Sequence, residues 1–129
     1  SHYNHAHHSE GLDVAEQIIA EKYPEYSAAF TKVCNRTWAH MFNMFVMRRD
    51  LFNQYCEWMF SILEEIEKRV DISGYDMYEA RIYGFVSEIL LDVWLEANNI
   101  NYKEQNVSFM EPQNWLKKGG LFLKRKFFK

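Results

Sequence analysis

Two long helix patterns in the second half of the chain constrain its fold more than any other feature. Over residues 51–70, apolar side chains recur at steps of three and four, the spacing of one face of a helix. Residues 76–97 are apolar almost all round, which is typical of a helix that is covered on every side. The sequence therefore predicts a helical core with the second of these helices at its centre.

Weaker patterns predict the remaining elements. Apolar spacing favours helices over residues 12–22 and 25–35, and Pro24 between them ends the first and can open the second. The apolar run at 41–47 and the segment 100–110 are predicted to be short strands. The expected fold class is mainly α, with about four helices and one or two short strands.

Charge is distributed unevenly along the chain and limits the function classes. Six basic residues and no acidic one follow from Lys117 onward, which leaves nine basic against 18 acidic residues before it. We therefore expect a domain over residues 1–116 and a basic amphipathic tail over 117–129. An acidic body argues against nucleic acid as a partner, because binding phosphates needs a basic face. Cys34 and Cys56 form no disulfide framework and are expected to be ordinary thiols of a cytosolic protein.

The N-terminal segment is rich in histidine and is predicted to be a polar loop. His5, His7 and His8 do not have the i, i+4 spacing of helical zinc ligands, so no metal site is predicted. We expect their imidazoles to bind hydroxyls or phosphates of a substrate. A tag remnant, a metal-binding loop and solvated surface histidines stay open as alternatives.

Polar residues on otherwise apolar segments are the next candidates. Arg81, Gly84 and Glu88 share one stripe of the central helix, and Asp92 extends it. Arg81 could contact phosphate or a carboxylate, and Glu88 could bind sugar hydroxyls. Alternatively, the two could form an internal ion pair or contact the acidic and basic faces of neighbouring elements. Asn43 lies inside an apolar run and needs hydrogen-bond partners, either backbone groups or a sugar hydroxyl.

Two aspartates stand where long helices are expected to begin. Asp50 can cap the helix over 51–70, and Asp76 with Glu79 has the spacing of a capping box. A carboxylate at a helix start is more often a cap than a catalytic base, because the helix dipole favours its charged form.

Three stretches together resemble a known family. The stretches HAHHSEGLDVAEQIIAEKYPEY, HMFNMFVMRRDLFNQYCEWMFSILEEIEKRVDIS and YEARIYGFVSEILLDVWLE are similar, in order and spacing, to capsular polysaccharide synthesis glycosyltransferases, whose shared domain was long catalogued as having unknown function. The resemblance covers about residues 1–116. It implies the C-terminal, acceptor-side half of a GT-A-like α/β enzyme.

The resemblance also implies roles for individual residues. His5, His7 and His8 would follow the sheet, Asn43 would lie on a strand lining the sugar site, and Arg81 would lie on the helix below it. If the enzyme inverts configuration, Asp76 or Glu88 would be the base that deprotonates the acceptor hydroxyl. No Asp-x-Asp motif is present, and no donor-binding region is matched. We therefore expect this chain to be inactive alone, and the cofactor stays unknown, with a divalent metal open in the complete enzyme.

Partners and location follow from the same resemblance. A nucleotide-sugar donor and a glycan or lipid-linked acceptor are expected, at the cytoplasmic face of the plasma membrane. The tail over 117–129 mixes basic and apolar residues in a way that suits an anionic membrane surface, although its apolar residues could equally pack onto the domain. Two other functions remain open: a non-enzymatic helical interaction module, and a metal-binding regulator that uses the histidine loop.

Overall fold

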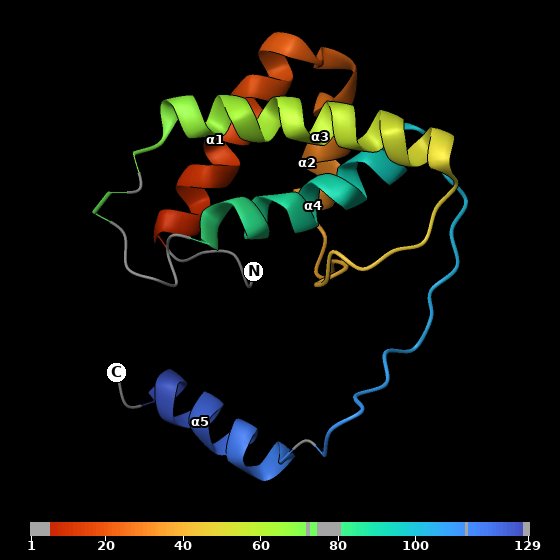
Figure 1. The fold of residues 1–129 in the computed structure, drawn as a ribbon. Helices are drawn as coiled ribbons and strands as arrows, with labels where there is room; N and C mark the ends of the chain where they lie inside the picture. Colours follow the sequence, from red (N-terminus) through yellow and green to blue (C-terminus); the bar gives the residue numbers. More distant parts are fainter. Residues whose placement is uncertain (1–5, 72, 75–80, 113, 128–129) are drawn as a thin grey trace.

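Five α-helices and one short 3-10 helix make up the described part of the chain (Figure 1). The structure is a computed structural model and describes residues 6–71, 73–74, 81–112 and 114–127. The elements are α1 (Ala6–Lys22), η1 (Pro24–Tyr26), α2 (Ser27–Cys34), α3 (Arg49–Arg69), α4 (Ile82–Ala97) and α5 (Trp115–Phe127). The prediction of a mainly helical chain is confirmed.

The two predicted strands are wrong. Residues 40–48 and 100–110 are extended or irregular, and the described residues contain no strand. A strand needs a neighbour that pairs with its backbone, and apolar composition does not supply one. The run at 41–47 is not a buried strand either, because Phe42, Met44 and Val46 are exposed.

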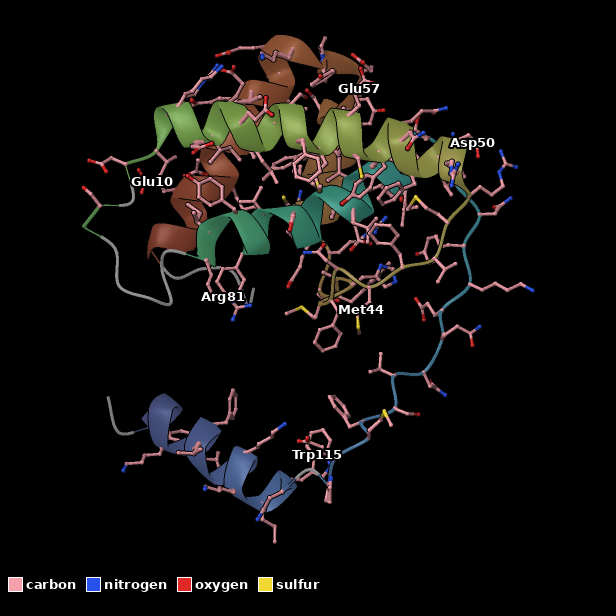
Figure 2. The ribbon with its side chains drawn as sticks, viewed as in Figure 1. Glu10, Met44, Asp50, Glu57, Arg81 and Trp115 are labelled. Carbon is pink, nitrogen blue, oxygen red and sulfur yellow. The ribbon has the colours of Figure 1, made fainter. Side chains whose placement is uncertain are left out.

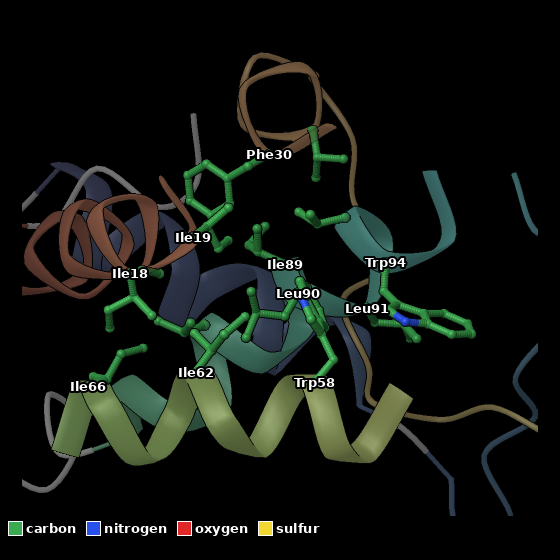
Figure 3. Packing of buried hydrophobic residues seen from close by; sticks show 14 of the residues in the cluster. Ile18, Ile19, Phe30, Trp58, Ile62, Ile66, Ile89, Leu90, Leu91 and Trp94 are labelled. Carbon is green, nitrogen blue, oxygen red and sulfur yellow. The ribbon is translucent and has the colours of Figure 1, made fainter. Parts of the chain in front are cut away.

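Helices α1 to α4 enclose one hydrophobic core. Helix α4 packs against α1, α2 and α3, so the prediction of a central helix is confirmed. Figure 3 shows side chains from all four helices meeting in this core. The fully buried side chains include Ile18 and Ile19 of α1, Ile62 and Ile66 of α3, and Ile82, Leu90 and Val93 of α4. Each such side chain contributes about 1.5–3 kcal/mol relative to exposure, which makes this core the source of the domain's stability.

A close approach between α1 and α4 depends on a glycine. A Cβ atom added to Gly11 would lie 2.6 Å from Cγ1 and 2.7 Å from Cδ1 of Ile82. It would also lie 3.1 Å from Cγ2 of Val86. These distances are shorter than van der Waals contact, so α1 and α4 can lie this close together only because residue 11 has no side chain.

The helix ends explain two of the boundaries. Asn99 has φ of 50° and follows α4, and the backbone N–H of Ile100 donates to the carbonyl of Leu95 at 3.0 Å. This is the left-handed ending common at helix C-termini, and it confirms the predicted stop at residues 98–99. Asp50 does not cap α3 as predicted. Arg48 precedes the helix, and Asp50 lies in its first turn in an ion pair with Arg48.

Beyond α4, the chain leaves the bundle. Residues 101–112 are exposed and contain no regular structure, and they lead to α5, which lies apart from α1 to α4 (Figure 1). The tail was not predicted to be helical, and α5 begins two residues before the expected boundary at 117. Within the described residues, no helix combines the length and apolar content needed to cross a bilayer.

Candidate functional site

The predicted site residues fall into three groups. His5 and Asp76 lie outside the described residues. His7 and His8 belong to the first turns of α1, so the expected polar loop is already helical from residue 6. The other three, Asn43, Arg81 and Glu88, lie on or beside α4.

Asn43 connects the segment between α2 and α3 to α4. Its side-chain N–H donates to Oγ of Ser87 at 2.7 Å, and the Ser87 hydroxyl donates to the carbonyl of Gly84 at 2.8 Å. The amide therefore finds a partner in a side chain of α4 rather than in a backbone group of a sheet. Asn43 as a residue is exposed.

Arg81 and Glu88 lie on the same helix as this contact. Arg81 immediately precedes α4, and its guanidinium carbon lies 5.5 Å from the ring centroid of Phe85. Glu88 is half-buried, one turn after Gly84. Figure 2 shows Arg81 and Met44 on one side of the bundle and Glu57 on the opposite side. The stripe predicted on the central helix thus lies near the segment that carries Asn43.

A cluster around His40 was not predicted from the sequence. The backbone N–H of His40 donates to Oδ2 of Asp92 at 3.0 Å, and its Nδ1 contacts Oδ1 of the same carboxylate. On the other side of the ring, Nε2 lies 3.2 Å from Oε1 of Glu104. Asp92 is only 2% exposed, so this histidine is the partner that a buried carboxylate requires.

Two aromatic rings flank the imidazole. Trp38 and Tyr102 lie edge-on to His40, with ring centroids 5.6 and 5.3 Å away. The guanidinium carbon of Arg36 lies 4.6 Å from the Trp38 ring centroid, and Arg36 also pairs with Glu96 of α4. We call the surface formed by Trp38, His40, Asn43, Ser87 and Tyr102 the His40 face.

The charge state of His40 is set by competing effects. Partial burial lowers its pKa, but hydrogen bonds to the carboxylates of Asp92 and Glu104, together with their negative charges, raise it by more. The net result is a pKa above the ordinary value for histidine. At neutral pH, the imidazolium form is therefore favoured more than in an isolated histidine.

The arrangement of this cluster does not suit a metal ion. The two carboxylates contact opposite nitrogens of the imidazole ring, so they do not converge on one point. More broadly, no group of three or more histidine, cysteine, aspartate or glutamate side chains within the described residues could hold a metal ion. His40 instead resembles an acid–base group whose orientation is fixed through Nδ1.

A hollow lies elsewhere on the bundle. It is shallow, has a volume of about 220 Å³ and is lined by Tyr23, Gln54, Glu57 and Trp58. The indole N–H of Trp58 is buried and has no hydrogen-bond partner among the described residues. Tyr26 stacks on the same indole at a centroid distance of 4.7 Å, so the ring is already packed on one face.

Comparison with known families decides the affiliation of the chain. A family model described as a domain of unknown function, DUF4422, matches residues 1–99. The chain belongs to the DUF4422 family. No curated protein and no solved structure matches it. His40, Asn43, Ser87 and Asp92 lie within the DUF4422 domain, whereas Tyr102, Glu104 and α5 lie beyond the matched residues.

The sequence carried weak signals for the residues that prediction missed. Asp92 was recognised as a charge on an apolar helix, and such a charge needs a partner. His40 stood at the edge of the apolar run, 52 residues away in sequence. No spacing rule connects two residues on separate elements, and only the fold brings them together.

Proposed function

We propose that this DUF4422 chain is the acceptor-side part of a bacterial glycosyltransferase. The enzyme would transfer a sugar from a nucleotide-sugar donor to a polysaccharide or lipid-linked acceptor at the cytoplasmic face of the membrane. The proposal is supported by the resemblance of three stretches to capsular polysaccharide synthesis enzymes and by the chemistry of the His40 face.

The observation that carries the proposal is the combination of groups on that face. Sugars are bound by planar amide and carboxylate groups that pair with hydroxyls, and by aromatic rings that cover their C–H surfaces. The His40 face offers the Asn43 amide, with Trp38 50% exposed and Tyr102 48% exposed beside it. Glu88 lies on the adjacent helix and adds a carboxylate.

Proton transfer is the chemical step that the acceptor side must provide. When the glycosidic bond forms, the acceptor hydroxyl loses its proton as the nucleotide diphosphate leaves. Glu88 and Asp76 are the proposed bases from the sequence. His40 is a third candidate in its neutral form, in which Nε2 would accept the proton once its contact with the exposed Glu104 is broken, while Asp92 contacts Nδ1.

Binding can be tested with the chain itself. In a ¹⁵N-labelled sample, the indole N–H signals report on four tryptophans, of which Trp38 lies on the His40 face and Trp115 lies on α5. Both side chains are exposed, so Trp115 is an internal control for nonspecific effects. Titration with capsular oligosaccharides should shift the Trp38 signal and leave that of Trp115 unchanged, and Asn43→Ala should weaken the effect. Equal shifts for both indoles, or none for either, would refute sugar binding at this face.

Catalysis requires the complete enzyme that contains this chain. Replacement of the true base should lower turnover at least about a hundredfold while leaving the fold intact. Asp76→Asn, Glu88→Gln and His40→Gln separate the three candidates, and Glu57→Gln serves as the control because Glu57 lies on the opposite side of the bundle (Figure 2). If all three variants retain near-normal turnover, none of these residues is the base. Arg81→Gln and Asn43→Ala should instead raise the substrate concentration needed.

A helical interaction module is the alternative function. It is favoured by the exposed apolar side chains between α2 and α3, which include Met41, Phe42, Met44 and Val46. Exposed apolar groups on adjacent residues are common at protein interfaces. In this case Phe42→Ser would abolish partner binding without affecting sugar binding, whereas Asn43→Ala would have the opposite effect for a glycosyltransferase.

A further inference from the structure

Helix α5 is the one helix of the described chain that stands away from the hydrophobic core. It lies apart from the α1–α4 bundle in Figure 1, and every described side chain between residues 114 and 124 is exposed. Its large apolar side chains are among the most exposed in the molecule, with Trp115 66% and Leu116 91% exposed. Leaving so much apolar surface in water is unfavourable unless something covers it.

Most of the apolar and basic residues of α5 occupy different sides of the helix. Helical steps of about 100° per residue place the apolar residues within an arc of about 140°. These are Trp115, Leu116, Phe122, Leu123 and Phe127. The same steps place Lys117, Lys118, Lys124 and Arg125 on the opposite side together with the apolar Leu121, whereas Lys126 falls within the apolar arc. Lys118 nevertheless reaches over the Trp115 ring, with Nζ 5.4 Å from its centroid.

This distribution fits a helix that lies in the plane of a bilayer surface. The helix is too short to cross a membrane, and it contains no acidic residue. An apolar side with large aromatic and leucine side chains can enter the acyl boundary while lysines meet anionic headgroups. We propose that α5 binds the surface of a bilayer that contains anionic lipids.

The charge of the rest of the chain favours an arrangement in which α5 alone touches the lipid surface. Nine basic and 18 acidic residues precede Lys117, so an anionic bilayer would repel the α1–α4 bundle and attract the helix. The exposed segment over residues 101–112 gives the separation that such an arrangement needs. This inference does not depend on glycosyl transfer, because it concerns only the attachment of the chain to a surface.

The expected strength follows from the charges and the apolar side. Each basic residue near an anionic surface changes the partition coefficient by about fivefold. Loss of Lys117, Lys118 and Lys124 should therefore weaken binding on the order of a hundredfold at low salt. Salt at several hundred millimolar should weaken binding of the unmodified chain in the same direction, because it screens exposed charges.

Vesicle sedimentation with the whole chain tests the proposal. Vesicles of phosphatidylcholine with phosphatidylglycerol should bind the chain at low salt, and pure phosphatidylcholine should bind it much more weakly. The lysine variant combines Lys117→Gln, Lys118→Gln and Lys124→Gln, and the apolar-side variant combines Leu116→Ser, Phe122→Ser and Leu123→Ser. Both should lose most of the binding.

Leu121→Ser is the matched control, because it removes an apolar side chain from the basic side of the same helix. It should retain most of the binding, whereas Leu123→Ser alone should lose more. Equal losses for the two single variants would mean that the helix does not bind through one side. No binding of the unmodified chain at low salt would overturn the proposal.

Sedimentation velocity without lipid distinguishes the main competitor, a second copy whose acidic body binds α5. Dimers that disappear in the lysine variant, in a chain that does not bind vesicles, would assign α5 to self-association instead. A monomer that binds anionic vesicles, with the order of variants given above, supports the proposal.

Discussion

Substitution of two glycines by alanine should change the stability of the domain in opposite directions. Gly11 lies in α1 where it meets α4, and an added Cβ would lie 2.6 and 2.7 Å from two carbons of Ile82. Gly84 lies in α4, and an added Cβ there has no neighbour within 4 Å. The same added methyl group therefore meets tightly packed atoms at Gly11 and empty space at Gly84.

The magnitudes follow from two competing terms. Replacing glycine by alanine inside a helix stabilises it by about 1 kcal/mol, because alanine loses less backbone entropy on folding. At Gly11 the methyl group must displace Ile82, which is fully buried, and such overpacking costs about 1–3 kcal/mol. We expect Gly11→Ala to lower the free energy of unfolding by about 1 kcal/mol. Gly84→Ala should raise it by about 1 kcal/mol.

Urea denaturation followed by circular dichroism measures both effects. With a typical slope of about 1–3 kcal/mol per molar urea, a difference of about 2 kcal/mol separates the midpoints by roughly 1 M. The double variant Gly11→Ala with Ile82→Ala provides the control, because it removes both Cγ1 and Cδ1 of Ile82 from the clash. Its cost should be smaller than the sum of the two single costs. If Gly11→Ala is as stable as the unmodified chain, the inferred close packing of α1 on α4 is wrong.

Three further predictions concern buried polar groups. The pKa of His40 is raised in the folded chain. Its stabilising contribution is therefore complete below about pH 6.5, the unfolded value, and is lost as pH rises through the folded pKa. His40→Gln should flatten the dependence of stability on pH, measured by urea denaturation from pH 6 to 9. Asp92→Asn should flatten it too, and an unchanged profile in either variant would refute the contact. Tyr55→Phe should raise the free energy of unfolding by about 1 kcal/mol, because the buried Tyr55 hydroxyl has no hydrogen-bond partner among the described residues. If the variant is less stable instead, the hydroxyl is hydrogen-bonded to a bound water. Burial, and to a smaller extent the charge of Glu16, raises the pKa of Cys34 to about 11. At pH 8, iodoacetamide should therefore modify this thiol far more slowly in the folded protein than in the urea-unfolded protein. Peptide mass mapping would measure the difference.

Local patterns in the sequence were sufficient for the helices of the bundle. The three- and four-residue spacing of residues 51–70 corresponds to α3, and Pro24 marks the boundary between α1 and η1. These features depend on neighbours within one or two turns, which is the range over which periodicity carries information. The start of α1 at Ala6 was missed because residues 6–10 contain few apolar side chains to reveal a helical period.

The site was harder to predict because its contacts are long-range. Asn43 was recognised as a polar group that needs a partner, but the partner, Ser87, lies on a different helix. His40 was passed over because nothing near it in sequence explains its role. The apolar run between α2 and α3 suggested a buried strand, yet Phe42, Met44 and Val46 are exposed. Such pairings depend on how helices pack, and residue spacing does not encode that.

The contact between His40 and Glu104 also limits how far α5 can lie from the α1–α4 bundle. If Glu104 is held at the bundle, the free tether before Trp115 is residues 105–114, which span at most about 36 Å when fully extended. Release of both Glu104 and the Tyr102 ring would lengthen the tether to residues 101–114, with a maximum of about 50 Å. For a flexible chain, this lowers the effective concentration of α5 at a surface beside the bundle by only roughly 1.7-fold. The His40 face and α5 therefore remain within a few tens of ångströms of each other in either state of the contact.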